Sequence, residues 1–146
     1  MPSKRRIIPI DPEAKQLVKL AVEAEEQGYA FVDRLIQEAK SGENGFNEKG
    51  ECFCGVFLDG ELVGCGGINV DPYIDQKVGR LRHVYILKRN RRAGVASALV
   101  HNLLERSKPA FSSIRLRTSD RNADKFYEAL GFSRTDEENA THIIKI

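Results

Sequence analysis

The segment from Ile86 to Leu99, ILKRNRRAGVASAL, brings four cations close to a run of small residues and could hold an anion. The cations are Lys88, Arg89, Arg91 and Arg92, and the small residues are Ala93, Gly94, Ala96, Ser97 and Ala98. The first turn of a helix has unpaired backbone N–H groups and a partial positive charge. Small side chains let oxygen atoms reach those groups, and guanidinium groups suit phosphates. The segment therefore predicts a phosphate site at a helix start.

Two motifs in this chain resemble signatures of the GNAT superfamily of acyl-CoA-dependent N-acyltransferases. The spacing Arg91-x-x-Gly94-x-Ala96, directly after an apolar strand, resembles the R/Q-x-x-G-x-G/A turn of that family. Further along, NADKFYEALGF, from Asn122 to Phe132, resembles its A-x-x-x-Y-E-x-x-G-F pattern. The motifs occur in the family's order, and the predicted elements follow the family over nearly the whole chain.

The resemblance implies acetyl-CoA as co-substrate, with the turn around the diphosphate of coenzyme A and no metal. It assigns to coenzyme A the residues Val84, Tyr85, Ile86, Arg91, Arg92, Ala93, Gly94, Val95, Ala96, Ser97 and Asn122. In the family, the main chain around Tyr85 would hydrogen-bond the pantetheine arm and the thioester carbonyl. Asn122 departs from the pattern, because the family's asparagine more often stands seven residues before the tyrosine, where this chain has Asp120.

The implied reaction is the transfer of an acetyl group to a primary amine by direct attack on the thioester. The amine must be neutral, whereas an alkylamine with a pKa of ~10.4 is about one part in a thousand neutral at pH 7. The departing thiolate needs a proton or a hydrogen bond. Tyr127 matches the family's tyrosine that protonates the thiolate. The alternative for Tyr127 is a core tyrosine on the face of Phe126 and Leu130.

The usual base of the family is missing from the strand before the turn. Many relatives have a carboxylate or histidine there, where this chain has Arg80 and Arg82, and an arginine stays protonated. Strand alternation places His83 on the opposite face, which favours a core or surface histidine. A proton relay through water is one hypothesis, with Asp71, Tyr73 and Asp75 as candidates, and loss of the proton to bulk solvent is another. Arg80 and Arg82 are either solvated strand-edge residues or a clamp for an anionic acceptor, such as an amino acid or acidic metabolite.

The elements that position these residues form a mixed α/β (α+β) pattern. Strands are predicted at residues 6–10, 52–58, 62–70, 79–87, 114–118, 132–134 and 141–146, and helices at 12–27, 31–40, 93–105 and 121–130. Asp11 is the expected N-cap of the first helix. The order predicts a mostly antiparallel sheet of about six to seven strands flanked by about four helices. Strand 79–87, the following helix and strand 114–118 form its central β-α-β crossover.

Length and composition predict a single domain over residues 1–146 with a polarised charge, and the resemblance implies that this domain is acetyltransferase-like. The net charge is +2, but the segment from Gln76 to Thr118 is basic and the segment from Asp11 to Glu61 is acidic. Such a field favours an anionic partner. A nucleic-acid module would need cations along a helix face, and residues 93–105 contain no Lys or Arg. An acyl-CoA-sensing regulator without catalysis remains an alternative.

Three cysteines and an N-terminus without an apolar segment indicate the cellular setting. Cys52, Cys54 and Cys65 lie in strand-like runs without the partners of a zinc site, so reduced structural thiols are expected. No stretch is apolar enough to cross a bilayer. We expect a cytoplasmic protein that acts on acetyl-CoA and an amine, without nucleic-acid or membrane partners, and with a homodimer as a possibility.

Overall fold

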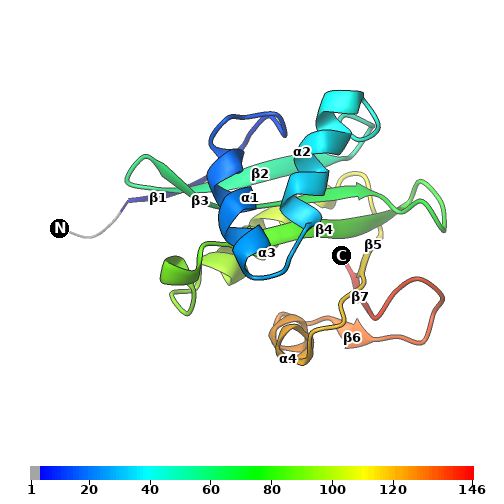
Figure 1. Ribbon diagram of the computed structural model, residues 1–146. Coiled ribbons are helices and arrows are strands. Elements are labelled where there is room, and N and C mark those ends of the chain that lie inside the picture. The colour runs from blue at the N-terminus through cyan, green and yellow to red at the C-terminus, as the bar shows by residue number, and fades with distance from the viewer. Residues whose placement is uncertain (1–3) are drawn as a thin grey trace.

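One sheet contains all seven strands of the computed structural model, which describes residues 4–146 (Figure 1). Met1 to Ser3, part of the basic N-terminal segment, lie outside the described residues. The strands are β1 (Arg5–Pro9), β2 (Cys52–Leu58), β3 (Glu61–Val70), β4 (Val78–Ile86), β5 (Ser113–Leu116), β6 (Ser133–Arg134) and β7 (His142–Lys145). Their order is β1-β2-β3-β4-β5-β7-β6, and only β4 and β5 pair in parallel. The predicted mostly antiparallel sheet with one crossover is confirmed.

Helices cover both faces of this sheet (Figure 1). The helices are α1 (Leu17–Glu26), α2 (Phe31–Ser41), α3 (Val95–Ser107) and α4 (Arg121–Ala129). The pair α1 and α2 lies on one face, and α3 lies on the other. A Cβ atom at Gly66 of β3 would lie only 3.2 Å from Leu99 and 3.4 Å from Leu103 of α3. The missing side chain at Gly66 therefore lets α3 pack closely on the sheet.

The expected N-cap of α1 is wrong. The helix begins at Leu17, and Asp11 lies before it in a turn, where its Oδ1 accepts a hydrogen bond from the N–H of Glu13 at 2.8 Å. The N–H of Ala14 closes the same turn onto the carbonyl of Asp11 at 2.9 Å. An aspartate before a proline serves a short turn as well as a helix, and here the local turn is formed instead.

The parallel pair β4 and β5 separates soon after it begins. Pairing joins only Val78–Arg80 to Ser113–Arg115, although β4 continues to Ile86. On its other side β4 stays paired with β3 as far as Ile86. The second half of β4 therefore has a main-chain edge that β5 does not cover. Such an edge lets an extended ligand bind between the two strands.

Candidate functional site

A cavity of about 640 Å³ lies where β4 and β5 separate. It is bounded by residues 80–86 of β4, by residues 116–120 after β5, and by parts of α2 and α4. The residues predicted from the sequence that line it are Arg80, Arg82, Val84, Tyr85, Ile86, Arg91, Ala96, Asn122 and Tyr127. The other predicted residues, Arg92, Ala93, Gly94, Val95 and Ser97, belong to the turn and helix start beside it.

The turn before α3 exposes backbone donors. Gly94 has φ of 77°, a left-handed conformation, so α3 begins at Val95 and not at the predicted Ala93. The N–H of Ala98 makes the first bond of the helix, to the carbonyl of Gly94 at 3.1 Å. The N–H groups of residues 95–97 therefore have no acceptor within the helix. A Cβ atom at Gly94 would meet nothing within 4 Å, so space for oxygen atoms lies beside these donors.

Two of the four cations that precede α3 are held by contacts with other residues. Arg89 forms an ion pair with Glu61. Arg91 donates from Nε to the carbonyl of Ile86 at 2.9 Å and from Nη1 to Oε1 of Gln27 at 3.2 Å. Arg92 is exposed and forms no ion pair within residues 4–146. Protein contacts thus anchor the turn through two cations, while the side chain of Arg92 remains open to an anion.

A small polar network ties the end of α1 to the strand before the turn. The hydroxyl of Tyr85 donates to Oε2 of Glu23 at 2.5 Å, and the same oxygen accepts the N–H of Lys88 at 3.1 Å. Burial alone would raise the pKa of Glu23. The hydrogen bonds from Tyr85 and Lys88, with the charges of Arg91 and Lys88, outweigh burial and hold that pKa below its usual value. The network therefore keeps a carboxylate ionised directly beneath the turn.

Replacing Tyr85 by phenylalanine should reduce the free energy of unfolding by about 1–2 kcal/mol, because Glu23 loses its hydroxyl donor. Coenzyme A should also bind less tightly, since the turn loses part of its support. The stabilisation is present above the pKa of an unfolded glutamate and is lost as the pH falls through the lower folded value. Urea unfolding of Tyr85→Phe and wild type at pH 7 and pH 3 measures the loss of stability and its pH dependence. Calorimetric titration measures the binding of coenzyme A. An equal loss in Tyr73→Phe, whose ring is half exposed, would contradict this role.

The predicted face of the strand for the His83 side chain is wrong. Gly67 pairs with Arg82 and Cys65 with Tyr85, so Gly66 alone stands opposite both His83 and Val84. His83 occupies this bulge with φ of 61°, and its ring lies 6.4 Å from Phe31 and 6.1 Å from Phe46. A Cβ atom at Gly67, the partner of Arg82, would also meet Phe46. His83 therefore shares a face with Arg82, because a bulge interrupts strand alternation.

His83 is buried and neutral. Burial, followed by the charges of Arg82 and Arg34, lowers the pKa of His83 to about 3. Its Nε2 is enclosed and has no hydrogen-bond partner within the described part of the chain. An imidazole in this environment is a weak base, so it does not replace the missing carboxylate of the strand.

Stability should depend on pH through His83. The unfolded chain takes up a proton near pH 6.5 and the folded chain does so only near pH 3, so stability is full above pH 6.5 and falls between these values. From pH 7 to pH 5 this lowers the free energy of unfolding by about 2 kcal/mol. Urea unfolding of wild type and His83→Asn at both pH values isolates the effect, since asparagine tolerates a positive φ. Identical pH dependence of the two proteins would contradict the lowered pKa.

The two arginines of β4 differ in their surroundings. Arg80 lies near buried Asp71, with Nη1 3.5 Å from Oδ2, and its guanidinium is 5.3 Å from the ring centre of Tyr73. The Nε of Arg115 is 3.4 Å from the same carboxylate oxygen. Asp71 is only 2% exposed, and this enclosure does not favour a proton relay from solvent. Arg82 has one polar contact, from Nη1 to the amide oxygen of Asn69 at 3.5 Å.

Helix α4 presents Tyr127 to the cavity. Its ring packs against Phe126 at 5.0 Å and Phe132 at 5.5 Å, and no hydrogen bond within residues 4–146 involves its hydroxyl. Burial raises the pKa of Tyr127 to about 12, so the hydroxyl keeps its proton at neutral pH. Tyr127 is thus packed like a core tyrosine and also lines the cavity, and its role as the proton donor stays a prediction.

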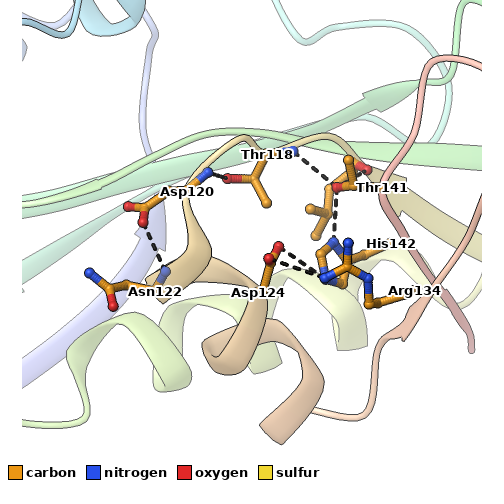
Figure 2. Close-up of polar contacts among 8 residues, drawn as sticks. Thr118, Asp120, Asn122, Asp124, Arg134, Thr141 and His142 are labelled. Atoms are coloured by element: carbon orange, nitrogen blue, oxygen red, sulfur yellow. Dashed lines mark hydrogen bonds and ion pairs between the residues drawn. The ribbon is translucent and has the colours of Figure 1, made fainter.

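Polar contacts fix the start of α4 (Figure 2). Asp120 is its N-cap, and Oδ1 accepts the N–H of Asn122 at 2.9 Å. Asp124, one turn further, is 3.6 Å from Nε2 of His142 on β7, which connects α4 to the sheet. Aspartate and asparagine cap helices about equally well. Asp120, which stands where the family pattern has an asparagine, therefore serves as the cap of α4.

The side chains of the cavity wall that sequence reasoning missed include Tyr29, Phe31, Arg34 and Arg117. Three of these four come from the start of α2 and the loop before it, and one follows β5. No motif in the sequence marks these four residues. Their approach to β4 depends on how α2 packs, which local patterns do not specify.

Within residues 4–146 no cluster of His, Cys, Asp and Glu could hold a metal ion, and the three cysteines are free. Over the same range, no helix has the length and apolarity needed to cross a membrane.

Comparison with known proteins agrees with this geometry. The acetyltransferase (GNAT) family model matches residues 14–132. A mouse protein, probable N-acetyltransferase family 8 member 5, is 35% identical in an alignment of 91 residues that covers 59% of this chain and only 40% of the mouse protein. Among solved structures, a putative acetyltransferase from Exiguobacterium superposes with a TM-score of 0.85 at 24% identity, covering 99% of this chain and 94% of that one. The PaiA N-acetyltransferase of Thermoplasma acidophilum, in complex with coenzyme A, gives 0.69 at 17% identity, with 96% of each chain covered. This chain belongs to the GNAT family of acetyltransferases.

Proposed function

We propose that this protein transfers an acetyl group from acetyl-CoA to a primary amine. The observation that carries the proposal is the juxtaposition of an open helix start with a cavity between two diverging strands, lined by the protonated Tyr127. An anion site and a proton donor at one cavity suit a thioester whose carrier contains phosphates. Family membership and the fold shared with the PaiA acetyltransferase add support.

Residues on three elements would hold coenzyme A. The unpaired N–H groups of residues 95–97 and the guanidinium of Arg92 suit its diphosphate. The uncovered edge of β4 at residues 84–86 suits the amide groups of its pantetheine arm. The carbonyl of Ile86 already accepts from Arg91. The N–H of Leu87 bonds to Val63, and successive residues face opposite edges of a strand, so the main chain of Tyr85 faces β3 and Val84 is the better candidate at the open edge. Asn122, at the start of α4, lines the same cavity.

Bound acetyl-CoA supplies an activated acetyl thioester. In the transfer, the acceptor nitrogen bonds to the acetyl carbonyl carbon, and the bond between that carbon and sulfur breaks. The sulfur gains one proton, and the nitrogen loses one. Tyr127 gives its hydroxyl proton to the sulfur and regains one that the nitrogen has released through solvent.

The amine reaches the site in its neutral form. The only carboxylate in the cavity wall is that of Asp120, which caps α4, and His83 is a weak base. Arginines in the wall disfavour an ammonium ion and therefore lower the pKa of a bound amine. We infer that bulk solvent removes the first proton and that the positive field of the cavity retains the neutral amine.

A binding measurement followed by a kinetic one tests the function. Acetyl-CoA at a hundred times its Kd should add ~2.7 kcal/mol of stability, and duplex DNA should add none. Thiol release from acetyl-CoA with a panel of amines then detects transfer. Stabilisation without thiol release would indicate an acyl-CoA sensor, and absence of stabilisation would refute the proposal. Size-exclusion chromatography of the same samples tests the homodimer.

A further inference from the structure

The wall of the cavity is strongly cationic. It contains five arginines, Arg34, Arg80, Arg82, Arg91 and Arg117, and one acid, Asp120. Arg80 lies against Asp71, and Arg91 is anchored by Ile86 and Gln27. Arg34, Arg82 and Arg117 form no ion pair within the described residues 4–146. Three arginines of this wall therefore have no ion-pair partner among the described residues, although Arg82 also borders a second cavity that is lined by Glu38, Glu43, Glu48 and Glu51.

Two of these three arginines line the cavity from elements that contact each other. Arg82 is on β4, and Arg34 is on α2. Both residues line the cavity together with His83. Arg82 makes one contact at the limit of hydrogen bonding, and Arg34 is exposed. The pair is thus available to a ligand.

Arg82 lies apart from the turn that suits a diphosphate. Arg82 precedes Ile86 by four residues, which at a strand rise of about 3.3 Å separates them by at most about 13 Å, because the bulge at His83 shortens this part of β4. Arg92 and the start of α3 lie beyond Ile86. The donor phosphates would therefore lie beyond the C-terminal end of β4, whereas Arg82 is at its middle, which leaves the pair Arg34 and Arg82 for the acceptor.

An apolar wall stands beside the two arginines. Phe31 is three residues before Arg34 on α2, so both project from one side of the helix. The ring of Phe31 lies 5.8 Å from that of Tyr29 and 6.1 Å from that of Tyr85. A ligand here meets guanidinium donors and aromatic surface together. This surrounding suits a molecule with an anionic group on an apolar body.

We propose that the acceptor is a small primary amine that also carries an anionic group, a carboxylate or a phosphate, and that Arg34 and Arg82 bind this group. The inference rests on the proposed function and specifies its substrate class. It replaces Arg80, which forms an ion pair with Asp71, by Arg34 from α2 as the partner of Arg82. Planar guanidinium groups bind carboxylates and phosphates alike with paired hydrogen bonds. The experiment below therefore compares an amine that carries a carboxylate with one that carries a phosphate.

Matched pairs of amines test the preference in the protein saturated with coenzyme A. L-Phenylalanine is compared with L-phenylalaninamide, and O-phosphoethanolamine with ethanolamine, by calorimetry and by thiol release from acetyl-CoA. At least one anionic amine should bind and react at least tenfold better than its uncharged counterpart. The pair that shows the difference identifies carboxylate or phosphate. Equal behaviour within both pairs overturns the proposal.

Variants assign the effect to the two arginines. Arg34→Ala and Arg82→Ala should each weaken binding of the preferred anionic amine about tenfold and leave the Kd of coenzyme A unchanged. Lys40→Ala, which removes an exposed charge from the other end of α2, should change neither value. Weaker binding of coenzyme A in both arginine variants would show that they serve the donor, and would overturn the proposal.

Calorimetry keeps the two proposals separable. If the protein binds coenzyme A and the anionic amine but releases no thiol, the transferase function fails while the acceptor site stands. If it acetylates amines without preference for an anionic group, the function stands and the acceptor class fails. Retained binding of coenzyme A shows that each variant is folded.

Discussion

Replacing Gly94 by glutamate is expected to weaken coenzyme A binding about 100-fold. Gly94 precedes the unpaired N–H groups of residues 95–97, and a side chain there would enter open space, so a steric clash is not the cause. The carboxylate would instead compete for those N–H groups and repel the diphosphate. Isothermal titration of coenzyme A into wild type and variant measures the change.

Two controls separate charge from backbone strain. Gly94→Ala introduces a side chain at φ of 77° without a charge and should cost about 1 kcal/mol of stability with little loss of binding. Gly60→Glu adds the same carboxylate at φ of 86°, also in open space, in the turn between β2 and β3, and should leave binding intact. Unchanged binding in Gly94→Glu would remove the basis for a diphosphate at this turn.

Replacing Tyr127 by phenylalanine should lower kcat about 100-fold, because the departing thiolate loses its proton donor. The Kd of coenzyme A should stay the same. Stability should change by less than about 0.5 kcal/mol, since the ring retains its packing and the hydroxyl has no partner in residues 4–146. In wild type, a pKa of about 12 keeps Tyr127 protonated, so its titration should not limit kcat below about pH 11.

Pre-steady-state kinetics distinguish chemistry from product release in this variant. A single-turnover rate that falls with kcat confirms an effect on the chemical step. Wild-type activity in Tyr127→Phe would show that solvent protonates the thiolate, and would leave Tyr127 with a structural role only. Tyr29→Phe serves as the control within the cavity, since Tyr29 is 43% exposed and stands at its other side.

Local patterns in this chain predicted the elements well. The strand 52–58 has the predicted bounds, and Asp59 and Gly60 form the expected turn, with φ of 51° and 86°. Both features depend on residues close in sequence, namely strand-forming side chains and a pair that tolerates positive φ. The start of α1 was predicted wrongly because Asp11 satisfies a turn of its own. Short polar side chains stabilise several local structures, and sequence alone does not rank them.

The candidate site likewise contains one feature that was predictable from the sequence and one that was not. The turn around Gly94 was predictable, because its function depends on consecutive residues whose small size and positive charge are visible in the sequence. The side of the sheet on which His83 lies was not predictable, because a single extra residue in β4 opposite Gly66 reverses the alternation of side chains that follows. Nothing in the residues around His83 identifies that bulge, which depends on the register with β3.

The sequence by itself predicted a turn of small residues at the start of α3 and, by resemblance, Tyr127 on α4, since both belong to contiguous motifs. The binding of an anion at that turn stays a prediction. Only the tertiary structure decided which arginines are free. Asp71 lies against Arg80, and α2 brings Arg34 toward Arg82 from a distant part of the chain. The physical reason is that the ligand-binding capacity of a charge depends on its neighbours in space, and these are set by packing between elements that the sequence separates.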